Sequence, residues 1–152
     1  MTLASGADRR GKNRNEGGID AAHATMPAGQ RIYAIGDIHG RLDLLKPLVQ
    51  AIEADTAAEP ETHSTVILLG DLIDRGPDSK GVLDFVRDWQ RRRTVHILMG
   101  NHEEMFLTAF TDAEYLSALL PHGADETLRS YGIAVPDSVH DVGQETLQTI
   151  QS

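Results

Sequence analysis

The sequence predicts an α/β fold in which helices connect the strands of a parallel sheet. Apolar runs of strand length alternate with stretches whose apolar residues recur at helical spacing, and this order is typical of parallel sheets with helical crossovers. The run Val66 to Leu69 is continuously apolar, as expected for a strand covered on both faces. Three polar motifs follow the strands. We therefore expect them at the carboxyl edge of the sheet, where such sheets bind ligands.

Strands and helices are predicted in regular alternation from residue 31 onward. Strands are expected at residues 31–35, 65–69 and 94–98. Amphipathic helices are expected at 42–52 and 79–89, followed by shorter helical segments at 104–110, 113–120 and 125–131. Ser79 is the expected N-cap of the second helix, and Gly132 is expected to close the last segment. Each predicted strand leads into a glycine, which favours a sharp turn there.

Composition divides the chain into three parts. Residues 1–29 are rich in Gly, Ala, Asn and charge without periodicity, which predicts a disordered leader. Residues 30–133 carry the strand and helix pattern and form the predicted domain. Residues 134–152 form a polar, weakly patterned tail.

Charge and residue usage exclude several classes of protein. The 152-residue chain has 14 Lys and Arg against 23 Asp and Glu, a formal net charge of −9. Nucleic-acid binding normally needs a basic excess, so no nucleic-acid partner is expected. No apolar stretch approaches the roughly 18 residues that span a membrane, and no secretory signal is evident. The chain has no cysteine, which excludes disulfides and thiolate chemistry. We expect a cytoplasmic protein, and its oligomeric state is not predicted.

Three glycine-flanked motifs carry the chemistry. They read Gly-Asp-Ile-His-Gly at 36–40, Gly-Asp-Leu-Ile-Asp-Arg-Gly at 70–76 and Gly-Asn-His-Glu at 100–103. Each alone is compatible with an ordinary turn. Three in succession, each after a predicted strand, indicate one shared site.

The polar residues of the motifs are suited to metal-assisted phosphate chemistry. Asp37 and Asp71 offer carboxylates, His39 an imidazole nitrogen and Asn101 an amide oxygen, a donor set that suits Mn²⁺, Fe or Zn²⁺. Two ions can stabilise both the attacking and the leaving oxygen in phosphoryl transfer, with a carboxylate bridging them. Asp71, in the middle motif, is the candidate for that bridge.

The other motif residues have predicted roles in binding and proton transfer. Arg75 offers a planar guanidinium for phosphate oxygens. His102 is the candidate general acid for the leaving oxygen, and Asp74 is expected to orient it. The nucleophile is expected to be water activated by the two ions, because no activated Ser, Cys or Lys is evident. Glu103 is assigned only a structural role at the start of a helix.

The three motifs resemble those of the calcineurin-like metallophosphoesterase superfamily. The Asp-Arg-Gly extension at 74–76 and the Asn-His-Glu form of the third motif resemble its serine/threonine phosphoprotein phosphatase branch, bacterial and phage type. The resemblance covers about residues 31–132 and implies two divalent ions, usually Mn²⁺ in bacterial members. By resemblance, the first metal is bound by Asp37, His39 and Asp71, the second by Asp71 and Asn101, the phosphate by Arg75 and Asn101, and the acid pair is His102 with Asp74.

The sequence lacks one part of the family pattern. The second metal of the family also takes two histidines, from a His-Ala-Gly-like and a Gly-His-Thr-like segment, and neither segment occurs here. We therefore expect a C-terminally truncated, partial metallophosphoesterase fold. Part of the usual sandwich would be missing, the second metal site would be incomplete and bind weakly, and turnover would be poor or absent.

Three functions remain open at this point. The first is a serine/threonine protein phosphatase-like hydrolase acting on a phosphorylated protein or a small phosphoester. The second is a symmetrical bis(5'-nucleosyl)-tetraphosphatase. The third, from another class, is a non-catalytic remnant that binds metal or phosphate.

Overall fold

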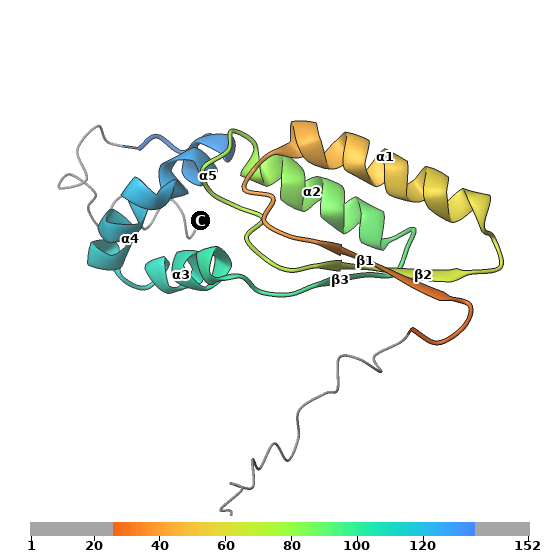
Figure 1. Ribbon diagram of the computed structural model, residues 1–152. Coiled ribbons are helices and arrows are strands. Elements are labelled where there is room, and N and C mark those ends of the chain that lie inside the picture. The colour runs from red at the N-terminus through yellow and green to blue at the C-terminus, as the bar shows by residue number, and fades with distance from the viewer. Residues whose placement is uncertain (1–25, 136–152) are drawn as a thin grey trace, which may run out of the picture.

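The computed structural model describes residues 26–135 (Figure 1). The predicted α/β class is confirmed, with a parallel sheet in the order β1-β2-β3. Its strands are β1 (Gln30–Ile35), β2 (His63–Leu68) and β3 (Val95–Ile97). Nearly all of the predicted leader and tail lies outside the described residues. No described helix is long and apolar enough to cross a membrane.

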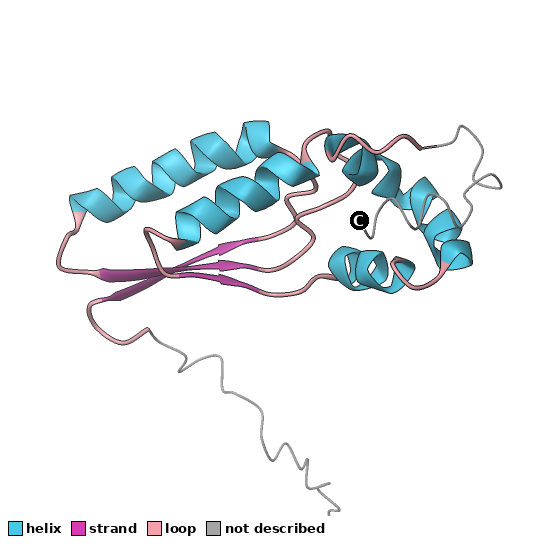
Figure 2. Ribbon diagram, turned by 180° about the vertical axis from the view of Figure 1, so that it is seen from behind, coloured by secondary structure: helices cyan, strands magenta, loops and turns pink. Residues whose placement is uncertain are grey.

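The crossover helices α1 (Leu42–Ala58) and α2 (Ser79–Gln90) pack on the same face of the sheet (Figures 1 and 2). Right-handed crossovers that advance in one direction, from β1 to β2 to β3, place successive helices on one side. The expectation that the sheet is covered on both faces is therefore wrong for residues 26–135. On the other face Ile32 of β1 is 46% exposed.

A hydrophobic core fills the space between the sheet and these two helices. The apolar stripes predicted for the helices point into it, with Trp89 of α2 at 1% exposure. The Trp89 indole N–H donates to Glu53 of α1 at 2.6 Å, which satisfies the polar atom of this ring. The buried members of the core include Leu45, Val49, Ile52, Val66, Leu68, Val82, Val86 and Trp89. This core fixes the strands whose ends carry the motifs.

A second group of helices lies beyond the carboxyl ends of the strands (Figure 1). It consists of α3 (Asn101–Ala109), α4 (Ala113–Leu119), the short 3-10 helix η2 (Leu120–His122) and α5 (Ala124–Ser130). These helices share a smaller apolar cluster that includes Leu116, Leu119 and Leu128. Gly132 follows α5 with φ 77°, as predicted for its closing residue. The motif loops therefore lie between a packed sheet and a packed helical group.

Several predicted boundaries differ from the structure. β2 ends two residues before Gly70 and β3 three residues before Gly100, so only the first motif directly follows its strand. The N-cap of α2 is Asp78, whose carboxylate accepts from the Gly81 N–H at 2.8 Å. Ser79, the predicted cap, is instead the first helical residue and is fully buried. Its hydroxyl has a different use, at the site.

Candidate functional site

The three motifs meet through direct backbone contacts. The amides of Ile38 and His39 both donate to the Asp71 carbonyl at 2.9 Å, which joins the first motif to the second. Gly70 has φ 101°, and a Cβ added there would collide with the backbone nitrogen of Gly100. Only glycine fits this conformation and this approach of the third motif. Motifs that are far apart in the sequence are thus in direct contact in the structure.

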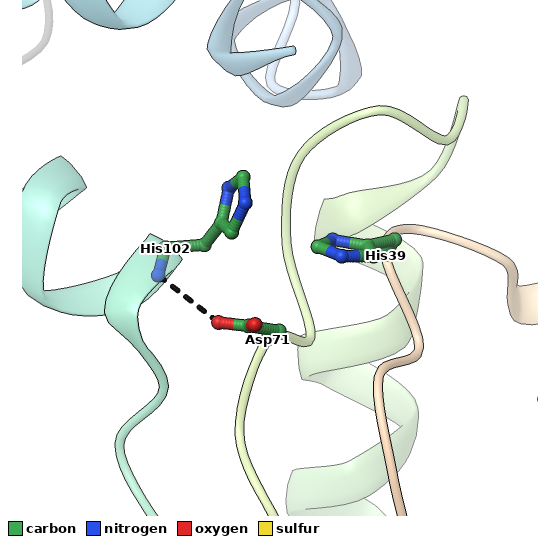
Figure 3. Close-up of side chains that lie close together, drawn as sticks. All are labelled: His39, Asp71 and His102. Atoms are coloured by element: carbon green, nitrogen blue, oxygen red, sulfur yellow. Dashed lines mark hydrogen bonds between the residues drawn. The ribbon is translucent and has the colours of Figure 1, made fainter. Parts of the chain in front are cut away.

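His39, Asp71 and His102 form a compact cluster, one from each motif (Figure 3). One ligand atom from each lies within 4.8 Å of the others, a separation that a single metal ion can span. The two imidazole rings lie edge to face with centroids 4.7 Å apart. His39 and Asp71 have φ values of 45° and 52°. Non-glycine residues rarely adopt this left-handed backbone, and such residues cluster at functional sites.

The orientation of both histidines is fixed by hydrogen bonds at Nδ1. His39 Nδ1 lies 2.8 Å from the Ile73 carbonyl, and His102 Nδ1 lies 2.7 Å from Asp74 Oδ2. A carbonyl and a carboxylate accept hydrogen bonds, so the tautomer that fits both contacts has N–H at Nδ1 and a lone pair at Nε2. Metal-binding histidines are commonly held in this way, with the other ring nitrogen anchored to a carbonyl or carboxylate.

Arg75 bridges the two histidine rings at their Nε2 atoms. Its two terminal nitrogens are each 3.0 Å from an Nε2 atom, one of His39 and the other of His102. Because a guanidinium only donates, these contacts agree with the tautomer set at Nδ1. The predicted phosphate-binding residue thus contacts both histidines of the cluster.

Asp74 is fully buried and holds His102 through a network that the motifs do not reveal. Its Oδ2 faces His102, while its Oδ1 accepts from the Thr127 hydroxyl at 2.7 Å. Its backbone N–H donates to Thr127 at 2.8 Å and to Ser79 at 3.1 Å. Thr127 comes from α5 and holds both the carboxylate and the amide of Asp74, whereas Ser79 comes from α2 and holds only the amide. From the sequence alone, nothing distinguishes Thr127 beyond its place in a weak helical segment.

Glu103 makes more contacts than its predicted role at a helix start requires. Its carboxylate accepts from the amides of Gly100 at 2.9 Å, Asp71 at 2.8 Å, Leu72 at 2.8 Å and Ile73 at 3.3 Å. Only the first belongs to its own motif. Asp71 Oδ1 in turn accepts from the His102 amide at 3.0 Å. Two carboxylates therefore connect the second motif to the start of α3.

Asp37 and Asn101 lie at the margin of the cluster. The Asp37 side chain is 68% exposed, and its Oδ2 is 3.8 Å from His39 Nε2. Asn101 is exposed at the first position of α3, next to His102. Asp37, His39 and Asp71 together offer nitrogen and carboxylate donors without sulfur, which fits Mn²⁺, Fe or Zn²⁺. The metal roles of Asp37, His39, Asp71 and Asn101 stay predictions.

Fold and site together define an α/β protein with an imidazole, carboxylate and guanidinium cluster at the carboxyl edge of its sheet. The chain matches the family described as calcineurin-like phosphoesterase over residues 30–142 and belongs to that family.

Bacterial relatives match parts of the chain. A protein of Cellvibrio japonicus named bis(5'-nucleosyl)-tetraphosphatase, symmetrical, is 38% identical over 78 residues, covering 51% of this chain and 26% of the relative. A Pectobacterium atrosepticum protein of the same name is 41% identical over 78 residues, covering 51% and 25%. A Pseudomonas putida protein, also of that name, is 32% identical over 106 residues, covering 70% and 32%. The chain spans about a quarter to a third of the length of these relatives.

Proposed function

We propose that the chain carries the active site of a metal-dependent phosphoester hydrolase. The observation that supports this most is the meeting of His39, Asp71 and His102 within 4.8 Å, with Arg75 bridging the Nε2 atoms of the two histidines. Nitrogen and carboxylate donors beside a guanidinium form a site for a divalent cation and an anionic substrate together. Family membership supports the same reaction class.

Asp37, His39, Asp71 and Asn101 are the residues proposed to hold the metal. The donor set suits two divalent ions, with Mn²⁺ the first choice and Fe or Zn²⁺ the others. When bound, such ions supply a Lewis acid and lower the pKa of water to give a nucleophile. Asp71 is the proposed shared ligand, because it contacts α3 on one side and the loop of the first motif on the other.

Arg75 and His102 are proposed to act on the substrate. The terminal nitrogens of Arg75 form a planar fork that matches two phosphate oxygens. His102 presents Nε2 to the cluster because its Nδ1 is held by Asp74. For the proposed acid step, His102 Nε2, which here faces Arg75, would first take up a proton from solvent and would then transfer it to the leaving oxygen. The buried Asp74 carboxylate stabilises the positive charge of the ring before that transfer.

Symmetrical dinucleoside tetraphosphates are the proposed substrates. The relatives reported above bear that activity in their names, which favours the second of the functions left open by the sequence over a phosphoprotein substrate. In either reaction the same groups would bind a phosphate, orient it and protonate a leaving oxygen. The substrate therefore has to be distinguished by assay.

The test compares two substrates on one preparation. The Mn²⁺-loaded chain is incubated with diadenosine tetraphosphate and, separately, with a phosphoserine peptide, and product is quantified for both. Faster release of ADP from the dinucleotide is the expected result. Faster release of phosphate from the peptide would return the protein phosphatase function to first place. Metal binding without turnover of either substrate would favour the non-catalytic remnant.

Two variants show whether turnover belongs to this site. Asp71→Asn keeps the shape of the side chain but removes its charge, and it should abolish hydrolysis. Asp88→Asn, at an exposed carboxylate paired with Arg91 on α2, is the matched control and should leave hydrolysis unchanged. Equal rates in the two variants would assign the activity to a contaminant or to another site.

A further inference from the structure

We infer that Glu103 is a positioning residue that sets the conformation of the Asp71 loop for metal binding. This inference rests on the proposed role of Asp71 as a metal ligand. It assigns Glu103 no direct contact with metal or substrate. Its action would pass through the backbone amides that its carboxylate holds.

The contacts of Glu103 reach well beyond its own helix. The Glu103 carboxylate accepts hydrogen bonds from four backbone amides, three of which are consecutive in the second motif, at residues 71–73. Hydrogen bonds to a charged acceptor are about twice as strong as those between neutral groups. Asp71 is held by them in a left-handed backbone conformation, φ 52°, which costs a non-glycine residue free energy. The Glu103 carboxylate is placed to offset that cost.

The geometry also couples two proposed ligand-bearing segments. Glu103 on α3 holds the Asp71 amide, and the Asp71 carboxylate holds the His102 amide on α3. Each carboxylate therefore binds the backbone of the other segment. Movement of the Asp71 loop relative to α3 would break both contacts at once. The direction of the Asp71 carboxylate is consequently tied to Glu103.

A simple helix cap does not account for this arrangement. Glu103 does occupy the third position of α3 and accepts from the Gly100 amide, as an N-terminal capping residue does. Capping, however, needs only that one bond, and the other three serve a loop about 30 residues earlier in the chain. The adjacent Glu104 lies in the same first turn and is exposed, so it shares the dipole effect without those bonds.

The test compares Glu103→Gln with its neighbour Glu104→Gln in the full chain. Both variants remove one charge from the first turn of α3, but only the first weakens the hold on the loop. Mn²⁺ affinity is measured by isothermal titration calorimetry, and folding by circular dichroism. Glu103→Gln should weaken Mn²⁺ binding by about 10–100-fold, the usual loss when a partner of a metal ligand is removed. Glu104→Gln should bind like the wild type. A folded Glu103→Gln variant with wild-type Mn²⁺ affinity would overturn the inference.

A second measurement uses the wild-type chain and covers the case in which Glu103→Gln does not fold. Amide hydrogen exchange at residues 71–73 is followed by NMR without metal. Protection of all three amides is expected if Glu103 sets the loop in advance, and unprotected exchange would contradict it. Absence of Mn²⁺ binding to the wild type would refute the proposed metal site and the positioning role with it. Normal wild-type binding with no loss in Glu103→Gln refutes the positioning role alone.

Discussion

Thr127→Val tests how the buried Asp74 is stabilised. The Thr127 hydroxyl donates to Asp74 Oδ1 at 2.7 Å and accepts from the Asp74 amide at 2.8 Å, with the residue only 1% exposed. Valine has nearly the same shape, so no cavity forms and the loss is that of the hydroxyl. The amide keeps its bond to Ser79, whereas Oδ1 loses its hydroxyl donor. A bond to a charged group is worth about 1.5–3 kcal/mol, and we expect a destabilisation of that size.

Urea unfolding followed by circular dichroism measures this change. Thr108→Val is the matched control, because its hydroxyl donates to the Glu104 carbonyl on the exposed side of α3. The control should change the free energy of unfolding by less than about 0.5 kcal/mol, as surface substitutions usually do. A shift in urea midpoint with an unchanged slope reports stability alone. If Thr127→Val loses no more than Thr108→Val, the hydroxyl does not support Asp74 as argued.

Three further predictions concern the backbone, the surface and the metal. Gly70→Ala should destabilise the fold by at least about 1–2 kcal/mol, because Gly70 has a positive φ and its added Cβ would meet the Gly100 backbone. Gly36→Ala is the control and should not destabilise the fold, because nothing lies within 4 Å of an added Cβ there. Equal urea midpoints for the two variants would contradict this prediction. Lys80 lowers the pKa of Asp84 through a hydrogen bond. The pair therefore stabilises the fold at pH values above the pKa that Asp84 has in the unfolded state. This contribution is lost as the pH falls through the pKa of Asp84 in the folded state. An NMR titration should show the Asp84 pKa rising in Lys80→Ala, and an unchanged value would argue against the pairing. Mn²⁺ at about 100 times its Kd should stabilise the chain by about 2.7 kcal/mol, and a melting temperature unaffected by Mn²⁺ would speak against binding to the native state.

The fold was predictable where local pattern and topology agree. Continuous apolar runs such as Val66–Leu69 identify strands, and the apolar spacing of α2 identifies its buried face, including Trp89. The prediction failed on which faces of the sheet are covered. A continuously apolar strand suggests burial on both sides, but the placement of helices depends on strand order and crossover hand. Strand order is set by contacts between distant segments, which periodicity does not contain.

The site was predictable to the extent that its residues sit in motifs. His39, Asp71 and His102 meet in space because their motifs follow neighbouring strands. Thr127 and the wider contacts of Glu103 were missed for a physical reason. A hydroxyl that holds a carboxylate needs no fixed spacing from it, and Thr127 lies 53 residues from Asp74. Glu103 was assigned to its helix because its three other partners are backbone amides, which carry no sequence signal.

Mn²⁺ titration of the wild type beside Asp71→Asn tests the central claim most directly. Saturable binding to the wild type and its loss in Asp71→Asn are expected, with both proteins folded by circular dichroism. Asp71 belongs to the three-residue cluster and contacts the segments on both sides of it, so no other single change should remove binding as completely. Binding of Mn²⁺ to Asp71→Asn with wild-type affinity would contradict the assignment of Asp71 as a metal ligand.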